Sequence, residues 1–169
     1  MIIEHAGRRF RVEHTHDDTM REPWIEHDGH GVISDWTTRD KAPHERIVAE
    51  DQNRYRYYDT RASLERARAD GWDAPPYGGT PAQQAARAML ADFEYCRAWC
   101  ADEWQWIGVV VTLLDAEDKP TRYTASLWGI ESLSEAAYLE TVAQELVDDI
   151  LTGLPDAVRQ DVAKLEALL

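Results

Sequence analysis

The segment from Trp106 to Leu114 restricts the fold most strongly, because it is dense in apolar and β-branched residues yet too short to span a membrane. A polar turn at residues 115–120, ending in Pro120, closes this segment, which therefore predicts a buried strand. Extended character resumes over residues 122–130. Two strand-like runs joined by a short polar turn predict a β-hairpin.

A long amphipathic helix is predicted directly after this hairpin, over residues 133–150. Ser132 or Ser134 is the expected N-cap and Gly153 the expected end of the helix. Its apolar residues recur at helical spacing, which predicts one buried side. These residues are Leu139, Val142, Ala143, Leu146, Val147 and Ile150.

The remaining elements predict an α+β fold. Further hairpins are expected at residues 2–14 and 45–58, and further helices at 60–69, at 81–103 and from Pro155 or Asp156 onward. Residues 15–44 predict a long irregular segment, and the Pro/Gly-rich residues 72–79 a connector. We therefore expect residues 1–169 to form a single domain, in which the three hairpins make one antiparallel sheet under a single layer of two or three helices.

The negative charge of the chain is unevenly distributed. The net charge is −14, and no Lys or Arg occurs from Tyr123 through Val158. Such a surface repels nucleic-acid phosphate, so we expect no direct binding to nucleic acid. Acidic surfaces are also typical of domains that need only solubility. The alternative is a partner-binding face made by the carboxylates that lie off the apolar side of the 133–150 helix: Glu135, Glu140, Glu145, Asp148 and Asp149.

A second interaction surface is predicted in the irregular segment. Trp24 and Trp36 lie there among loop residues, where an exposed aromatic side chain suits protein recognition. Arg39 follows Trp36 closely and could hold an anion. These three residues form the alternative partner-binding hypothesis.

The histidines suggest a metal-dependent enzyme as an alternative function. All six lie in the first 44 residues, and the candidate ligands are His14, His16, His27 and His30, with aspartates beside them. Their spacing matches no established metal motif, and an exposed His-rich loop gives the same pattern. No nucleophile elbow and no glycine-rich phosphate loop is present in the sequence. We therefore predict no catalytic residue, and no cofactor for the leading function.

The two cysteines and the N-terminal residues bear on the cellular compartment of the protein. Cys96 and Cys100 are four residues apart on a predicted helix, which predicts reduced, half-buried thiols that share one side. No basic-then-apolar leader and no membrane-length apolar run occurs in the sequence. We therefore expect a cytoplasmic protein without membrane contact.

Several segments resemble uncharacterised proteins of tailed bacteriophages and prophages. These segments are residues 102–114, 126–132 and 138–149, with 31–41 and 55–59 similar to earlier parts of the same group. The resemblance implies a phage protein in the host cytoplasm, and it implies no activity and no functional residues.

An acidic phage protein without catalytic motifs is most simply interpreted as a non-enzymatic inhibitor of a host nucleic-acid-handling defence complex, as anti-CRISPR proteins are. Its partner would be a host protein or nucleoprotein complex with a basic surface. A phage replication or assembly adaptor is a further alternative, and a homodimer is the other association that we consider.

Overall fold

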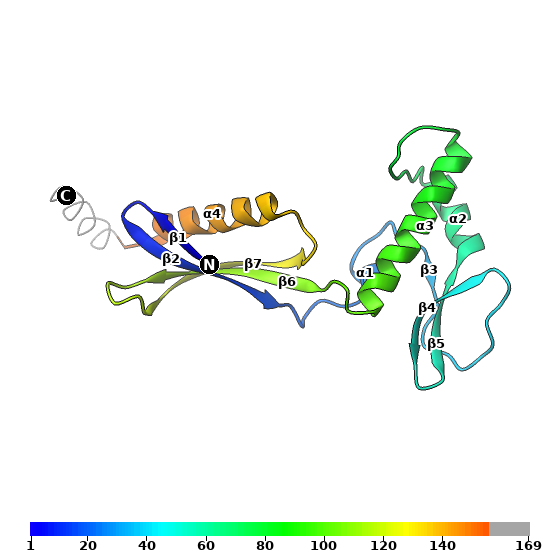
Figure 1. Ribbon diagram of the computed structural model, residues 1–169, viewed down its shortest axis with the longest axis horizontal. Helices are drawn as coiled ribbons and strands as arrows, with labels where there is room; N and C mark the ends of the chain where they lie inside the picture. The colour runs from blue at the N-terminus through cyan, green and yellow to red at the C-terminus, as the bar shows by residue number, and fades with distance from the viewer. Residues whose placement is uncertain (156–169) are drawn as a thin grey trace. The chain divides into compact units, whose positions relative to one another are not determined.

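The computed structural model describes residues 1–155, and they form an α+β structure with two antiparallel sheets and helices packed on them (Figure 1). The chain divides into two compact units. Unit 1 comprises Met1–Thr19 and the described residues from Gln105 onward, and unit 2 comprises Met20–Trp104.

Unit 1 is a four-stranded sheet with one helix on it. The strand order is β1-β2-β6-β7, all antiparallel. The elements are β1 (Ile2–His5), β2 (Arg8–His16), β6 (Trp106–Leu114), β7 (Pro120–Glu131) and α4 (Ala136–Gly153). Figure 1 shows α4 running along one face of this sheet.

The core of unit 1 lies between the sheet and α4. Because side chains alternate along a strand, Phe10 and Val12 of β2 point to the same face as Val109 and Val111 of β6, and Val12 pairs with Val111. The apolar side of α4 covers them with Val142, Ala143, Leu146, Val147 and Ile150, all buried. Full burial of one such aliphatic side chain stabilises the fold by about 1.5–3 kcal/mol.

The N-terminus of α4 differs from the predicted one. Its N-cap is Glu135, whose side chain makes no capping hydrogen bond, so neither serine caps it. Ser132 Oγ instead accepts from the Gln105 backbone N–H at 3.0 Å. Gly153 is the last residue of the helix rather than its stop, and Leu154 follows as a buried C-cap.

Unit 2 is a three-stranded sheet with three helices. The strand order is β3-β5-β4. The elements are α1 (Pro23–Glu26), β3 (Val32–Ile33), β4 (Glu45–Asp51), β5 (Arg54–Asp59), α2 (Thr60–Ala69) and α3 (Pro81–Cys100).

The two longer helices of unit 2 begin where the sequence predicts. The Asp59 side chain accepts from the backbone N–H groups of Arg61 and Ala62 and so caps α2. Thr80 and Gln83 form a reciprocal capping box at the start of α3, with Pro81 in the first turn.

A second core lies in unit 2. Tyr58 of β5 is fully buried, and its ring meets Phe93 of α3 edge-on at 5.5 Å. The buried apolar residues around this pair are Val48, Ala67, Ala85, Met89 and Cys96.

The α+β class is confirmed, whereas the expectation of a single sheet is wrong. The 45–58 hairpin pairs with β3 and makes its own sheet. Both edges of β6 are occupied, by β2 and β7, so no edge of β6 remains for that hairpin. The sequence predicts a single domain, while the described residues have two separate cores. The helix expected from Pro155 or Asp156 lies outside the described residues, and none of the helices that are described combines the length and apolarity needed to cross a membrane.

Candidate functional site

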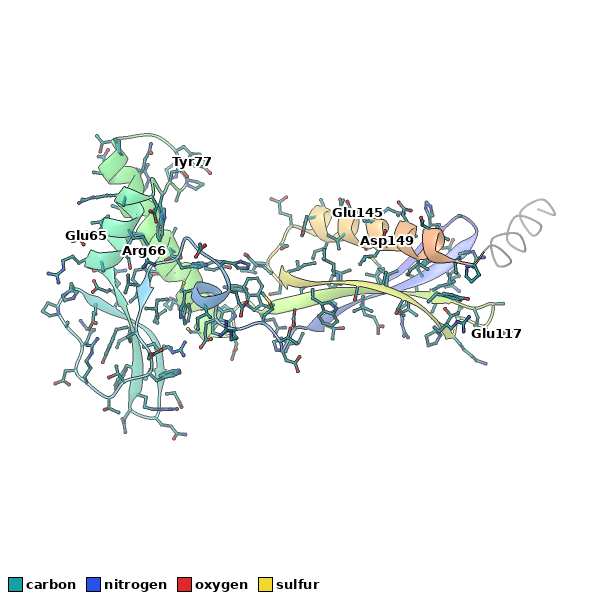
Figure 2. All side chains as sticks on the ribbon, turned by 180° about the vertical axis from the view of Figure 1, so that it is seen from behind. Glu65, Arg66, Tyr77, Glu117, Glu145 and Asp149 are labelled. Atoms are coloured by element: carbon teal, nitrogen blue, oxygen red, sulfur yellow. The ribbon has the colours of Figure 1, made fainter. Side chains whose placement is uncertain are left out.

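The five carboxylates predicted as a partner-binding face all lie on the surface. We call this set, Glu135, Glu140, Glu145, Asp148 and Asp149, the acidic face. All five residues are exposed, because the opposite side of α4 is buried against the sheet. Figure 2 labels Glu145 and Asp149, which project from α4 to solvent.

Within the acidic face, three carboxylates are close neighbours. Glu145 precedes Asp148 and Asp149 by three and four residues, the spacing at which side chains meet on a helix. Glu140 lies about 140° around the helix axis from Glu145. The acidic face therefore extends over most of the solvent side of α4.

In the part of the chain that the structure describes, Lys and Arg side chains do not neutralise the acidic face. Within residues 1–155, no Lys or Arg makes an ion pair with any of its five members. Asp148 is contacted by His5 Nε2 at 3.8 Å and by Gln144 Nε2 at 3.3 Å. Like charges three and four residues apart destabilise a helix by a few tenths of a kcal/mol per pair. A basic partner surface would relieve this repulsion.

The two tryptophans of the alternative surface meet around one arginine. The Arg56 guanidinium lies 5.4 Å from the Trp24 ring and 5.1 Å from the Trp36 ring. Its charge is paired with Glu22 at 2.7 Å, and its side chain is only 12% exposed. A surface pocket of about 390 Å³, lined by Trp36, Arg56 and Trp99 among others, opens beside it. Because Glu22 already pairs with this arginine, the pocket offers aromatic surface rather than a free cation.

Arg39 does not share that surface. It packs on the Tyr57 ring at 4.7 Å and pairs with Glu45, from Nη1 to Oε2 at 2.7 Å. Tyr57 follows Arg56 in β5, so the two side chains point to opposite faces of the sheet. The structure therefore brings Trp24 and Trp36 together and places Arg39 on the other face.

The four candidate histidine ligands are distributed over both units. His14 and His16 are exposed in β2 of unit 1, and His27 is exposed in unit 2. His30 is partly buried, and its Nδ1 lies 2.6 Å from Asp92 Oδ1. Of these four residues, His30 is the one that belongs to a group of metal-ligand side chains among the described residues.

That group is the His30–Asp92–Cys96 cluster of unit 2. Cys96 Sγ lies 3.7 Å from Asp92 Oδ1 and 3.8 Å from His30 Nδ1. Burial, together with the neighbouring Asp92 charge, raises the pKa of the Cys96 thiol far above its usual range. A protonated thiol is a poor nucleophile, so these three side chains do not make an activated catalytic cysteine.

Sequence reasoning missed Asp92 and Cys96 as partners of His30. Their four-residue spacing on α3 places both on one side of the helix, and this signal was available. The third member, His30, is 62 residues before Asp92, and no local pattern connects them. Their approach depends on the tertiary packing of unit 2.

Comparisons with known proteins assign neither a fold family nor an activity. No protein-family model matches the chain. Searches of the curated proteins and of the solved structures gave no significant match.

Proposed function

We propose that this protein is a non-enzymatic inhibitor that binds a basic surface of another protein through the acidic face of α4. The observation that carries the proposal is the set of five exposed carboxylates without a Lys or Arg partner in residues 1–155. None of them fills the core, which α4 builds from its opposite side. They are free to meet a partner without loss of packing.

The chemistry of this face suggests which surface it would cover. A dense row of carboxylates resembles the phosphates of a nucleic-acid backbone in charge, so it complements a groove lined with Lys and Arg. Complementary charge accelerates encounter and fixes orientation more than it raises affinity. The binding we propose is therefore sensitive to salt.

The resemblance to phage and prophage proteins suggests which class of protein the partner belongs to. In the cytoplasm of an infected host, basic grooves for nucleic acid belong to defence complexes as well as to housekeeping proteins. We propose a defence complex of the CRISPR kind as the target, with its nucleic-acid groove blocked by the acidic face.

A charge-reversal variant tests this proposal. Glu140, Glu145, Asp148 and Asp149 are replaced together by Lys in the test variant. The control variant carries the same number of reversals at exposed carboxylates elsewhere, namely Glu65, Asp70, Asp73 and Glu117, two of which Figure 2 labels. Both variants have the same net charge, so any difference between them reports position rather than total charge.

The assay measures whether each protein prevents purified CRISPR effector complexes from binding their target DNA, at low and at high salt. We expect the wild type and the control variant to inhibit DNA binding, and we expect this inhibition to weaken as the salt concentration rises. The test variant should not inhibit. Circular dichroism checks that both variants are folded. Equal inhibition by the test variant and the wild type would exclude the acidic face, and absence of inhibition by the wild type would exclude this class of target.

A further inference from the structure

We propose that His30, Asp92 and Cys96 form a binding site for one zinc-type divalent cation in unit 2. The site is independent of the acidic face and of the inhibitor function. Three kinds of ligand meet there, an imidazole nitrogen, a carboxylate oxygen and a sulfur. These are the donor types that hold zinc in proteins.

The three donor atoms lie at separations close to those around a metal ion. His30 Nδ1, Asp92 Oδ1 and Cys96 Sγ form a triangle with sides of 2.6, 3.7 and 3.8 Å. A tetrahedral zinc ion with ordinary bond lengths separates its donor atoms by about 3.3–3.6 Å. The two sides that include sulfur need almost no change, and the nitrogen–oxygen side needs to open by roughly 0.7 Å.

The carboxylate of Asp92 is held so that one oxygen faces the other two donors. Its second oxygen, Oδ2, accepts from the Gly31 backbone N–H at 2.8 Å and from the Tyr58 hydroxyl at 2.8 Å. These bonds fix the carboxylate and leave Oδ1 directed at His30 and Cys96. Outer hydrogen bonds of this kind orient the ligands of protein metal sites.

His30 is held from two sides as well. The Arg66 guanidinium donates to its backbone carbonyl at 2.8 Å, and the ring of Tyr95 stacks on its imidazole with centroids 5.5 Å apart. Gly31 lets this loop approach, because a Cβ at Gly31 would lie 2.2 Å from the Tyr58 hydroxyl oxygen. The imidazole is therefore positioned before any ion binds.

The donor set indicates which ion fits. A thiolate favours zinc or cobalt over magnesium or calcium, which prefer oxygen ligands. One thiolate and one carboxylate balance the two positive charges of the ion. The His30 and Asp92 side chains are 15% and 9% exposed, so the site lies at the edge of the core, where solvent can supply a further ligand.

Binding must displace the proton of the buried Cys96 thiol, since the thiolate is the ligand. Zinc affinity should therefore rise with pH, and uptake of zinc should release protons into the solution.

The test uses the untagged full-length protein, freed of metal by a chelator and titrated with zinc against a chromophoric competitor. We expect one equivalent of zinc per chain. Cys96→Ala and His30→Ala should lower the affinity by more than the roughly 10–100-fold that loss of an outer-shell partner costs. Cobalt should give a sulfur-to-metal charge-transfer band in the wild type that Cys96→Ala abolishes.

The matched control is Cys100→Ala. Cys100 lies one turn further along α3 and is outside the cluster, so its loss should leave zinc affinity and the cobalt band unchanged. A His14→Ala/His16→Ala variant separates this site from the exposed histidines and should also bind zinc normally. If Cys96→Ala does not fold, Asp92→Asn replaces it, because the amide oxygen can still accept from the Gly31 N–H and the Tyr58 hydroxyl while an NH2 group takes the place of the anionic ligand atom Oδ1.

Absence of zinc uptake by the wild type would overturn the proposal and leave the cluster as a hydrogen-bonded part of the core. Equal zinc affinity of the wild type and a folded Cys96→Ala or Asp92→Asn variant would overturn it as well. Neither result bears on inhibition by the acidic face, which is measured separately.

Discussion

The indole ring of Trp128 lies directly over Gly108 in the neighbouring strand of unit 1. A Cβ added at Gly108 would come within 2.3 Å of ring atom Cε3. Trp128 is 45% exposed, so its ring is held against the backbone of β6 while one side remains in solvent. The ring can therefore occupy this position only because residue 108 has no side chain.

Replacing Gly108 by Ala should destabilise the protein by about 1–3 kcal/mol, because the ring must leave its position. Urea denaturation measures the change in the free energy of unfolding. In a Trp128→Ala background the same replacement should cost much less, since the clashing ring is gone. Gly153→Ala is the control: its added methyl group meets no atom within 4 Å, so it should not destabilise. Equal costs of Gly108→Ala in both backgrounds would contradict this account.

The pairing of Arg39 with Glu45 predicts an acid-sensitive contribution to stability. Hydrogen bonds from Arg39, opposed in part by burial, lower the pKa of Glu45 from 4.5 to about 2. A carboxyl group whose pKa is lower in the folded state stabilises the fold above its unfolded pKa, and this contribution is lost as the pH falls through the folded pKa. The loss should therefore occur between about pH 5 and pH 2.

Glu45→Gln should remove this dependence. The difference in Tm between pH 7 and pH 3 should be smaller in Glu45→Gln than in the wild type. Glu65→Gln, at an exposed position on α2, is the control and should keep the wild-type pH profile. A profile unchanged by Glu45→Gln would show that this ion pair does not contribute.

Loss of the Tyr58 hydroxyl should be costly even without metal. Tyr58 donates to the Asp92 carboxylate at 2.8 Å from within the core of unit 2. Tyr58→Phe removes a hydrogen bond to a charged acceptor, which is worth about 1.5–3 kcal/mol. Tyr77→Phe is the control, since Tyr77 is 72% exposed and labelled at the surface in Figure 2. Chemical denaturation of both variants in the presence of chelator makes the comparison.

Both cysteines should react slowly with thiol reagents in the folded, metal-free protein. Burial raises the pKa of Cys100 to about 11, and burial together with Asp92 raises that of Cys96 further. Only the thiolate reacts, so neither thiol is activated near pH 7. Labelling followed by mass spectrometry should show slow modification of the native protein and rapid modification in denaturant. Rapid labelling of native Cys96 would contradict its complete burial.

Local signals in the sequence were sufficient for most of the individual elements. The apolar run of β6 and the start of α3 at Pro81 depend on neighbouring residues, and both are found where they were predicted. The N-cap of α4 could not be predicted in this way, because Ser132 accepts from the Gln105 backbone N–H beside the neighbouring strand β6. The N-cap propensity of an amino acid identifies residues that are able to cap a helix. It does not show whether a backbone group distant in the sequence occupies the capping side chain.

Long-range pairing could not be predicted for the same reason. The hairpin at residues 45–58 has the strand pattern of the other two, and nothing in its own residues determines which sheet it joins. The contact between His30 and Asp92 likewise depends on how a loop folds onto α3. The acidic face depends on the periodicity of a single helix. The sequence therefore predicted the exposed position of each of its five residues.

The way in which unit 2 interrupts unit 1 affects how the protein is made. The chain leaves unit 1 after β2 and returns at β6, where His16 pairs with Ile107. During translation, all of residues 20–104 therefore leave the ribosome before β6 does. At about 5–20 residues per second, the β1-β2 hairpin waits several seconds for its partner strand β6, and unit 2 is synthesised during that interval. A nascent chain arrested with residue 104 just outside the exit tunnel should thus carry a protease-resistant unit 2 and an N-terminal hairpin that is still cleaved.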